Sequence, residues 1–400
     1  MDPFLRFPAE ITQEIIRNTG DFASVENLIR ASPQVKAVFL ADPYPLLHYL
    51  LSSHPVTFTS EIRRLVSSIV LARSLQACYT SVDEYKKLDL GTPEIREQIC
   101  NPDTAAHVLH TAARIQRLSC ICLTRFRANL VAAVGSQDTG DVPNAIRGRN
   151  AGRPFAWIEE YRIQWALWHL QHYADLQNVH NTPMEPDGIV QHYRDWNNID
   201  LFMAEQIWAV ASELVGMGFD CSNPVAPNEA QSNWLSDAAW GFPGHSSIPF
   251  IRSLEPPAEI ERQFRFWSPP AAPAKAYKTE TWLSHARSKL LAPGQMRFFR
   301  SESRDKLAGG GGRLYSRTMM DVAPYRRLGV FLWDDWRMFS VGLLSDPCLE
   351  ELTTTLLSAF ESVGSCERIY SWEDITPWEE MREKSLSDHT VSRAWLKLAC

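Results

Sequence analysis

The first forty residues of the chain carry three short helical patterns of apolar residues. Ile11, Ile15 and Ile16 are spaced so that they share one face of a helix. Pro8 suits the first position of that helix, where no backbone N–H is needed. Two further apolar stripes follow, and they consist of Val25, Leu28 and Ile29 and of Val35, Val38 and Phe39. The pattern predicts three helices joined by tight turns within residues 1–52.

The start of the third helix is marked most clearly. Ser32 is a good N-cap, and Pro33 follows at the first helical position. A unit of three such helices buries a small fraction of its surface, so it is only marginally stable alone. We therefore expect it to pack on the rest of the chain or on a partner. It is either an N-terminal cap on a larger domain or a docking module.

Residues 53–400 show irregularly spaced helical patterns, with neither the period of WD40 blades nor that of leucine-rich repeats. The predicted helices are 60–77, 105–134, 155–178, 199–215, 259–266, 279–291 and 347–360. The aromatic residues that share one stripe of the third of these are Trp157, Tyr161, Trp165 and Trp168. Glycine, proline and polar residues at 135–154 predict a loop or linker. MRFFR (296–300) and RLGVFLW (327–333) predict strands, so the expected fold is mainly α: a three-helix module, then an irregular helical domain with a minor β element.

Composition and charge narrow the classes of function. The chain is 45% hydrophobic and 22% charged, which is typical of a globular protein. Its net charge of −7 lacks the basic character of a nucleic-acid-binding domain. No apolar run approaches the roughly 20 residues that cross a bilayer, and the first residues lack a signal-peptide pattern. We expect a cytoplasmic or nuclear protein that binds neither nucleic acid nor membranes.

The predicted helix 105–134 contains arginines and no acidic residue. Arg114, Arg117 and Arg125 fall on one stripe. This stripe is either a face that binds anions or acidic partners, or a set of arginines that pair with carboxylates elsewhere in this acidic chain. We favour the second interpretation.

His169 and His172 are three residues apart on a predicted helix, a spacing that can share a metal ion. The HExxH motif is absent, and Trp168 and Tyr173 flank the pair, which favours partly buried structural imidazoles. Phosphate-loop and GxSxG motifs are also absent from the sequence. We therefore expect no metal, no cofactor and no catalytic residue.

The aromatic segment YRRLGVFLWDDWRMFSVGLL (325–344) combines tryptophan with acids and arginines. Phe331 and Trp333 are predicted to lie in the core, because buried tryptophan is common where its N–H finds an acceptor. A surface turn is predicted for the next four residues, Asp334, Asp335, Trp336 and Arg337. This turn can contact a partner, because tryptophan and arginine are frequent at interfaces.

The N-terminal sequence FPAEITQEII…FASVENLIRASPQVKAVF resembles an F-box, in the form common in fungal proteins. The matching residues are Phe7-Pro8, Glu10-Ile11, Ile15-Ile16, Leu28, Ala31-Ser32-Pro33, Val35 and Phe39. Phe7 replaces the usual leucine, and Thr19 stands where leucine is more common, which weakens the apolar face at its end. The resemblance covers residues 7–39 only.

The resemblance implies that residues 1–52 dock the Skp-type adaptor subunit of a Skp–cullin–F-box ubiquitin ligase. The expected contacts are Phe7, Pro8, Ile11, Ile15 and Ile16. The residues expected either to join the interface or to hold the three helices together are Leu28, Ile29, Val35 and Phe39. Residues 53–400 then recognise an unknown protein, and ubiquitin transfer belongs to other subunits, so the chain is expected not to be an enzyme. The alternatives are a scaffold that works outside any ligase and an all-α enzyme that uses His169 and His172.

Overall fold

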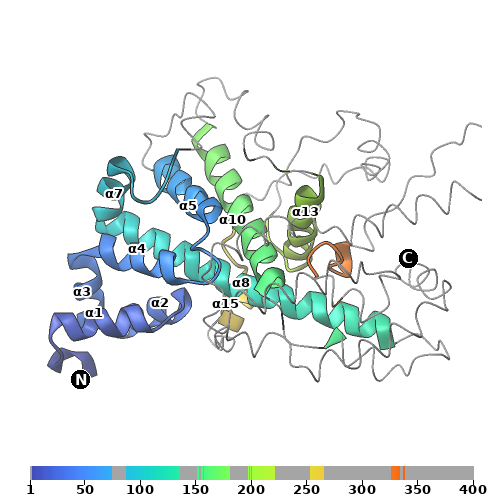
Figure 1. The fold of residues 1–400 in the computed structure, drawn as a ribbon. Helices are drawn as coiled ribbons and strands as arrows, with labels where there is room; N and C mark the ends of the chain where they lie inside the picture. The colour runs from blue at the N-terminus through green and yellow to red at the C-terminus, as the bar shows by residue number, and fades with distance from the viewer. Residues whose placement is uncertain are drawn as a thin grey trace, which may run out of the picture.

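The computed structural model describes residues 2–73, 87–135, 151–152, 155, 157–180, 197, 199, 201–220, 253–264, 326–333 and 337. Within these ranges the chain forms ten α-helices and one short 3-10 helix, and no strand (Figure 1). The prediction of a mainly helical protein is confirmed for this part of the chain.

Four short helices follow one another after the 3-10 helix η1 (Pro3–Arg6). They are α1 (Ala9–Asn18), α2 (Phe22–Ala31), α3 (Pro33–Ala41) and α4 (Pro43–Ser53). Asp21 caps α2 by accepting a hydrogen bond from the backbone N–H of Ser24 at 2.7 Å. Ser32 caps α3 in the same way, through the N–H of Val35 at 3.1 Å, as the sequence predicted. The three predicted helices are therefore present, although α1 begins one residue after Pro8.

Six further helices follow α4 in the described part of the chain. They are α5 (Ser60–Arg73), α7 (Pro93–Cys100), α8 (Pro102–Gly135), α10 (Trp157–His180), α13 (Leu201–Gly216) and α15 (Ala258–Phe264). All but α7 match a predicted helix within a few residues. The sequence predicted neither α4 nor α7, although each begins with a proline in its first turn. The predicted helices 279–291 and 347–360, and most of the predicted linker 135–154, lie outside the described residues.

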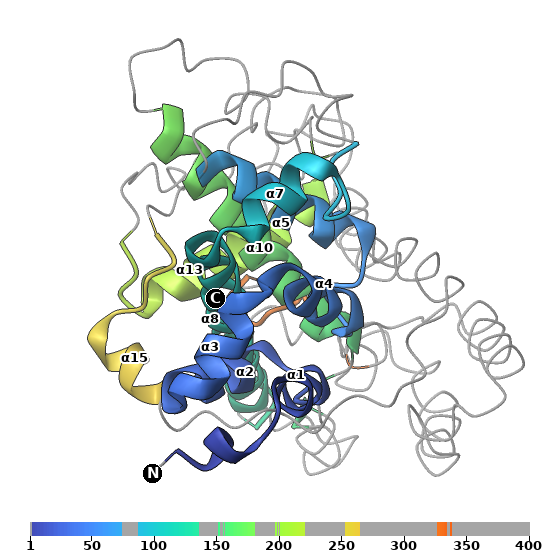
Figure 2. The ribbon, with the colours of Figure 1, turned by 90° about the vertical axis from the view of Figure 1, so that its left-hand side faces the viewer.

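The 34-residue helix α8 organises the packing. In Figures 1 and 2, α1, α2 and α3 lie on one side of α8, and α5 and α10 lie on the other. Helix α10 packs against α5, α8 and α13, so that residues 161–176 are buried all round the helix. Tyr161, Trp165 and Trp168 of the predicted aromatic stripe thus lie in a stretch of helix that its neighbours enclose. None of the described helices combines the length and the apolar composition that spanning a bilayer requires.

One hydrophobic core joins the N-terminal helices to the rest of the described chain. It runs from Ile16, Val35 and Phe39 through Phe126 of α8 to Trp333. Helix α2 packs directly on α8. The N-terminal helices therefore share buried side chains with α8 in the part of the chain that the structure describes.

Residues 327–333 form a helical turn followed by tight bends, so the strand prediction for this segment is wrong. The backbone N–H of Leu332 donates to the carbonyl of Gly329 at 2.8 Å, and the indole N–H of Trp333 donates to the carbonyl of Leu328 at 2.7 Å. A short apolar run cannot distinguish a strand from a buried turn. Phe331 and Trp333 are fully buried, which confirms their predicted place in the core. The other predicted strand, 296–300, lies outside the described residues.

Candidate partner-binding surface

A group of large apolar side chains is exposed on η1 and at the start of α1. Leu5, Phe7 and Ile11 are 63%, 43% and 47% exposed. Pro8 between them is also exposed, and Ile15 is half-buried one turn beyond Ile11 on the same helical face. We call Leu5, Phe7, Pro8, Ile11 and Ile15 the N-terminal apolar surface. Sequence reasoning found all of these residues except Leu5, which precedes the F-box-like motif.

Polar and aromatic groups border this region at the C-terminal end of α1. The guanidinium group of Arg17 lies over the ring of Tyr49 of α4, 5.8 Å from its centre. Arg17 is half-buried and Tyr49 is exposed. Arg17 also donates to Glu14 at 2.6 Å. Interfaces commonly combine an apolar centre with a polar rim. Glu14 and Arg17, on the same helix as Ile11 and Ile15, are polar residues of the kind found in such a rim.

The other residues of the motif divide between the core and its edge. Ile16, another of the expected partner contacts, is fully buried in this structure, and its side chain holds α1 in the core. Val35 and Phe39 are fully buried as well, and Leu28 and Ile29 are half-buried and pack against the same core. For these residues the structure favours the alternative that they hold the helices together.

Helix α2 is fastened to α8 by buried polar groups as well as by apolar packing. Arg117 of α8 forms an ion pair with Glu26 and donates to the carbonyl of Ala23 at 3.2 Å. The side-chain oxygen of Gln116 accepts from the backbone N–H of Ala23 at 3.1 Å. Burial alone would raise the pKa of Glu26, but hydrogen bonds from His110 and Arg117 lower it on balance. Glu26 is therefore a buried carboxylate that stays ionised between cationic and imidazole partners.

The arginine stripe of α8 is satisfied within the chain. Arg114 pairs with Glu255, Arg117 with Glu26, and Arg125 with Glu213. Each carboxylate comes from a different part of the chain: Glu26 from α2, Glu213 from α13 and Glu255 from the segment before α15. No local sequence pattern reveals pairs so far apart. The interpretation that these arginines pair with acids elsewhere in the chain is confirmed.

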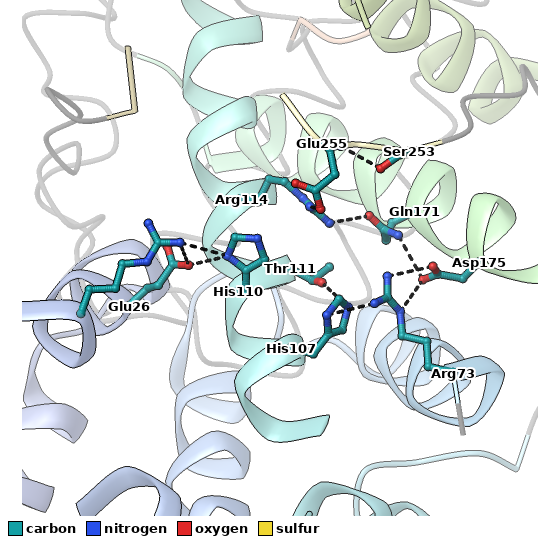
Figure 3. Close-up of polar contacts among 11 residues, drawn as sticks. Glu26, Arg73, His107, His110, Thr111, Arg114, Gln171, Asp175, Ser253 and Glu255 are labelled. Atoms are coloured by element: carbon teal, nitrogen blue, oxygen red, sulfur yellow. Dashed lines mark hydrogen bonds and ion pairs between the residues drawn. The ribbon is translucent and has the colours of Figure 1, made fainter. Parts of the chain in front are cut away.

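Arg114 also belongs to a chain of polar contacts that crosses from α8 to α10 and α5 (Figure 3). Arg114 donates to Gln171 at 3.1 Å, and Gln171 donates to Asp175 at 3.1 Å. Asp175 accepts two hydrogen bonds from Arg73 at 2.9 and 3.3 Å. Arg73 in turn lies 3.0 Å from Nδ1 of His107. The contacts connect three helices and give the buried side chains of Gln171 and Asp175 hydrogen-bond partners.

The pKa values within this polar chain follow from its burial. Burial raises the pKa of Asp175, although Arg73 and Gln171 act against it. Burial, with Arg73 and Arg114 nearby, lowers the pKa of His107 to about 4. A neutral His107 can accept from Arg73 through Nδ1 and donate through Nε2 to Thr111, 3.1 Å away. The arrangement supports packing of α5, α8 and α10.

His169 and His172 are both buried in α10. Burial lowers the pKa of His172 to about 3 and lowers that of His169 well below its usual value, so both rings are neutral at physiological pH. The ring of His169 lies 4.2 Å from that of Trp165. Among the residues that the structure describes, no group of three or more histidine, cysteine or acidic side chains is arranged to hold a metal ion.

Arg337 is buried, so its expected place on a surface turn is wrong. Its guanidinium group makes two hydrogen bonds to the carboxylate of Glu159, at 2.7 and 2.9 Å, and one to the carbonyl of Ala151 at 2.9 Å. It also lies 4.9 Å from the ring centre of Trp333. The two parallel hydrogen bonds between the guanidinium group and the carboxylate take the place of the water that would solvate an exposed arginine. Asp334, Asp335 and Trp336 lie outside the described residues.

Comparison of this chain with protein families, with curated proteins and with solved structures finds no match in any of the three. The functional interpretation therefore rests on the residues of the chain and on their geometry.

Proposed function

We propose that this chain is a substrate-recognition adaptor of a Skp–cullin–F-box ubiquitin ligase. The N-terminal apolar surface docks the Skp-type adaptor subunit, and the rest of the chain binds an unknown protein substrate. One observation carries the proposal: Phe7, Pro8 and Ile11, which the F-box resemblance assigns to the interface, are large or rigid apolar residues that the folded chain leaves exposed.

Several exposed apolar side chains within one short segment, here residues 5–15, are typical of a protein-interaction site. Covering them with a partner removes apolar area from water, which is favourable by about 25 cal/mol per Å². Ile11 and Ile15 also share one face of α1, so a single partner surface can reach both. These properties fit docking through α1.

The buried members of the motif fit the same proposal. Ile16 anchors α1, and Val35 and Phe39 anchor α3, in the core that the N-terminal helices share with α8. A face that is already ordered loses less conformational entropy when a partner covers it. The motif residues thus divide into those that hold the helices and those that remain available to the adaptor.

The attachment of α2 to α8 fits the delivery of a substrate. The ion pair between Glu26 and Arg117 and the hydrogen bond from Ala23 to Gln116 fix α2 on α8. An adaptor subunit docked on α1 would therefore hold the helices packed around α8 in a defined orientation. Such an orientation is what a recognition subunit requires in order to present a bound protein to a separate catalytic subunit.

The proposal is tested by calorimetric titration of the purified chain with the Skp-type adaptor. Ile11→Asp places a charge on the docking face, and we expect binding to weaken by about 100-fold or more, which corresponds to roughly 3 kcal/mol. Because Ile11 is exposed in the free chain, the variant should fold normally, and circular dichroism checks this.

Val215→Asp is the matched control. Val215 lies on α13 and is 50% exposed. Helix α13 is well separated from α1 in Figures 1 and 2. The same change of an exposed β-branched residue to aspartate should leave adaptor affinity unaltered. Failure of the wild-type chain to bind, or an equal loss in both variants, would refute the proposal.

Recovery of a cullin distinguishes action within a ligase from action as a scaffold. We expect the tagged wild-type chain to co-purify the adaptor together with a cullin, and Ile11→Asp to lose both. Recovery of the adaptor without any cullin would assign the chain to a scaffold role outside the ligase.

A further inference from the structure

The carboxylate of Asp2 joins the N-terminal turn to the start of α3. One oxygen accepts from the backbone N–H of Phe4 at 2.9 Å. The other accepts from the hydroxyl of Ser32 at 2.6 Å and from the backbone N–H of Gln34 at 3.2 Å. The hydrogen bond from Ser32 lowers the pKa of Asp2, so the group is ionised at neutral pH. We call this set of three hydrogen bonds the Asp2 latch.

The turn that the Asp2 latch holds contributes little to the core. None of the residues of η1 (Pro3–Arg6) is buried. Phe4 packs against the edge of the core, and its ring meets that of Phe7 edge-on with 6.2 Å between centres. Leu5, in contrast, is the most exposed large apolar residue described, at 63%. The latch therefore fixes a segment whose side chains Leu5 and Phe7 remain in solvent.

We propose that Asp2 is a positioning residue for docking of the Skp-type adaptor, and that Leu5 is a contact residue outside the F-box-like motif. The inference rests on the proposed function and extends the docking surface from α1 onto η1. A turn that is ordered before binding presents Leu5 and Phe7 in one arrangement, so less conformational entropy is lost when the partner covers them.

A purely structural role for Asp2 predicts something different. Asp2 lies at the N-terminus of α3, where a negative charge and an acceptor for the N–H of Gln34 stabilise a helix. If that were its whole role, removing the carboxylate would lower stability without any dependence on Leu5. Energetic coupling between Asp2 and Leu5 in adaptor binding separates the two roles.

The test is a double-mutant cycle with the full-length chain and the Skp-type adaptor, measured by calorimetry. We expect Leu5→Ala to weaken binding about tenfold and Asp2→Ala about fivefold. In the Leu5→Ala background, Asp2→Ala should weaken binding by less than about twofold, because residues that act together give non-additive effects.

Asp21→Ala is the matched control. Asp21 caps α2 through one carboxylate oxygen, 2.7 Å from the N–H of Ser24, whereas Asp2 contacts the start of α3. This variant should lower the melting temperature while adaptor affinity stays within about twofold of wild type. In the free chain, amide exchange at Leu5 and Phe7 should accelerate in Asp2→Ala and remain unchanged in Asp21→Ala.

The outcomes distinguish failure of the positioning role of Asp2 from failure of the proposed function. Equal losses from Asp2→Ala in both backgrounds, or no loss at all, would overturn the positioning role while leaving the proposed function intact. A wild-type chain that does not bind the adaptor would overturn the proposed function and this inference together.

Discussion

Glu26 of α2 and Arg117 of α8 are 91 residues apart in the sequence and form a buried ion pair, with side chains only 7% and 4% exposed. His110 and Arg30 approach the other oxygen of the same carboxylate, at 2.5 and 2.8 Å. The charge of Glu26 is thus satisfied from two helices. This relationship ties the segment that carries the proposed docking surface to the long helix around which the other helices pack.

Removing Glu26 should destabilise the whole described fold. Glu26→Ala leaves Arg117 buried without its carboxylate, and breaking a buried pair in this way costs about 3–5 kcal/mol. The free energy of unfolding in urea at pH 7 measures the loss. Glu14→Ala is the control, since its pair with Arg17 is exposed and worth about 1 kcal/mol or less. Similar losses in the two variants would contradict the buried role of Glu26.

Gly329 should not tolerate a side chain. Its φ of 71° is unfavourable for other residues by roughly 1–2 kcal/mol. An added Cβ would also lie 3.1 Å from the buried side chain of Phe126. We expect Gly329→Ala to lower the free energy of unfolding by about 2–4 kcal/mol in total.

Gly20→Ala provides the comparison for the backbone contribution alone. Gly20 has a similar φ of 78°, but the nearest atom to an added Cβ is 4.0 Å away. This variant should therefore lose only the roughly 1–2 kcal/mol of the left-handed conformation. If both variants lose the same amount, the close packing of Phe126 on Gly329 is incorrect.

Stability should depend on pH through the buried His54. Burial lowers its pKa from 6.5 to about 4. The unfolded chain therefore binds more protons between these values, so the contribution of His54 is complete above pH 6.5 and is lost as the pH falls. By pH 5 the loss is about 2 kcal/mol. Glu160, whose pKa burial raises to about 7, acts in the opposite direction, so the wild-type profile contains both effects.

A His54→Gln variant isolates this contribution. Glutamine has no group that titrates in this range, and its oxygen can replace Nδ1 as the acceptor for the N–H of Val56. Urea unfolding between pH 7 and pH 5 should show about 2 kcal/mol less loss of stability in the variant than in the wild type. Identical pH dependence in the two proteins would show that His54 is not buried in the neutral form.

The sequence predicted helices where the apolar period or the capping residues were distinct. Ser32 and Pro33 located the start of α3, and the long pattern 105–134 located α8 within three residues at its start. Helix α4 was missed because PYPLLHYLLSS is apolar on most sides and offers little periodicity. RLGVFLW was misassigned for a related reason, since a short apolar run fits a strand and a buried turn equally well.

The partners in ion pairs between residues far apart in the chain could not be predicted from the sequence alone. The acidic character of the chain was enough to predict that Arg114, Arg117 and Arg125 find carboxylates, but nothing local identified which ones. Arg337 was placed at the surface because its burial depends on Glu159, 178 residues earlier. Leu5, which is 63% exposed, was overlooked for another reason: it lies outside the F-box-like motif, which begins at Phe7.

Amide hydrogen exchange of the chain, with and without a saturating amount of the Skp-type adaptor, tests the docking claim most directly. The amides of Leu5 and Phe7 are held only by short-range hydrogen bonds to Asp2 and Phe4, so they report readily on a partner that covers η1. We predict slower exchange across η1 and α1, with α13 unchanged. A complex that protects other helices while η1 and α1 exchange as in the free chain would contradict docking through the N-terminal apolar surface.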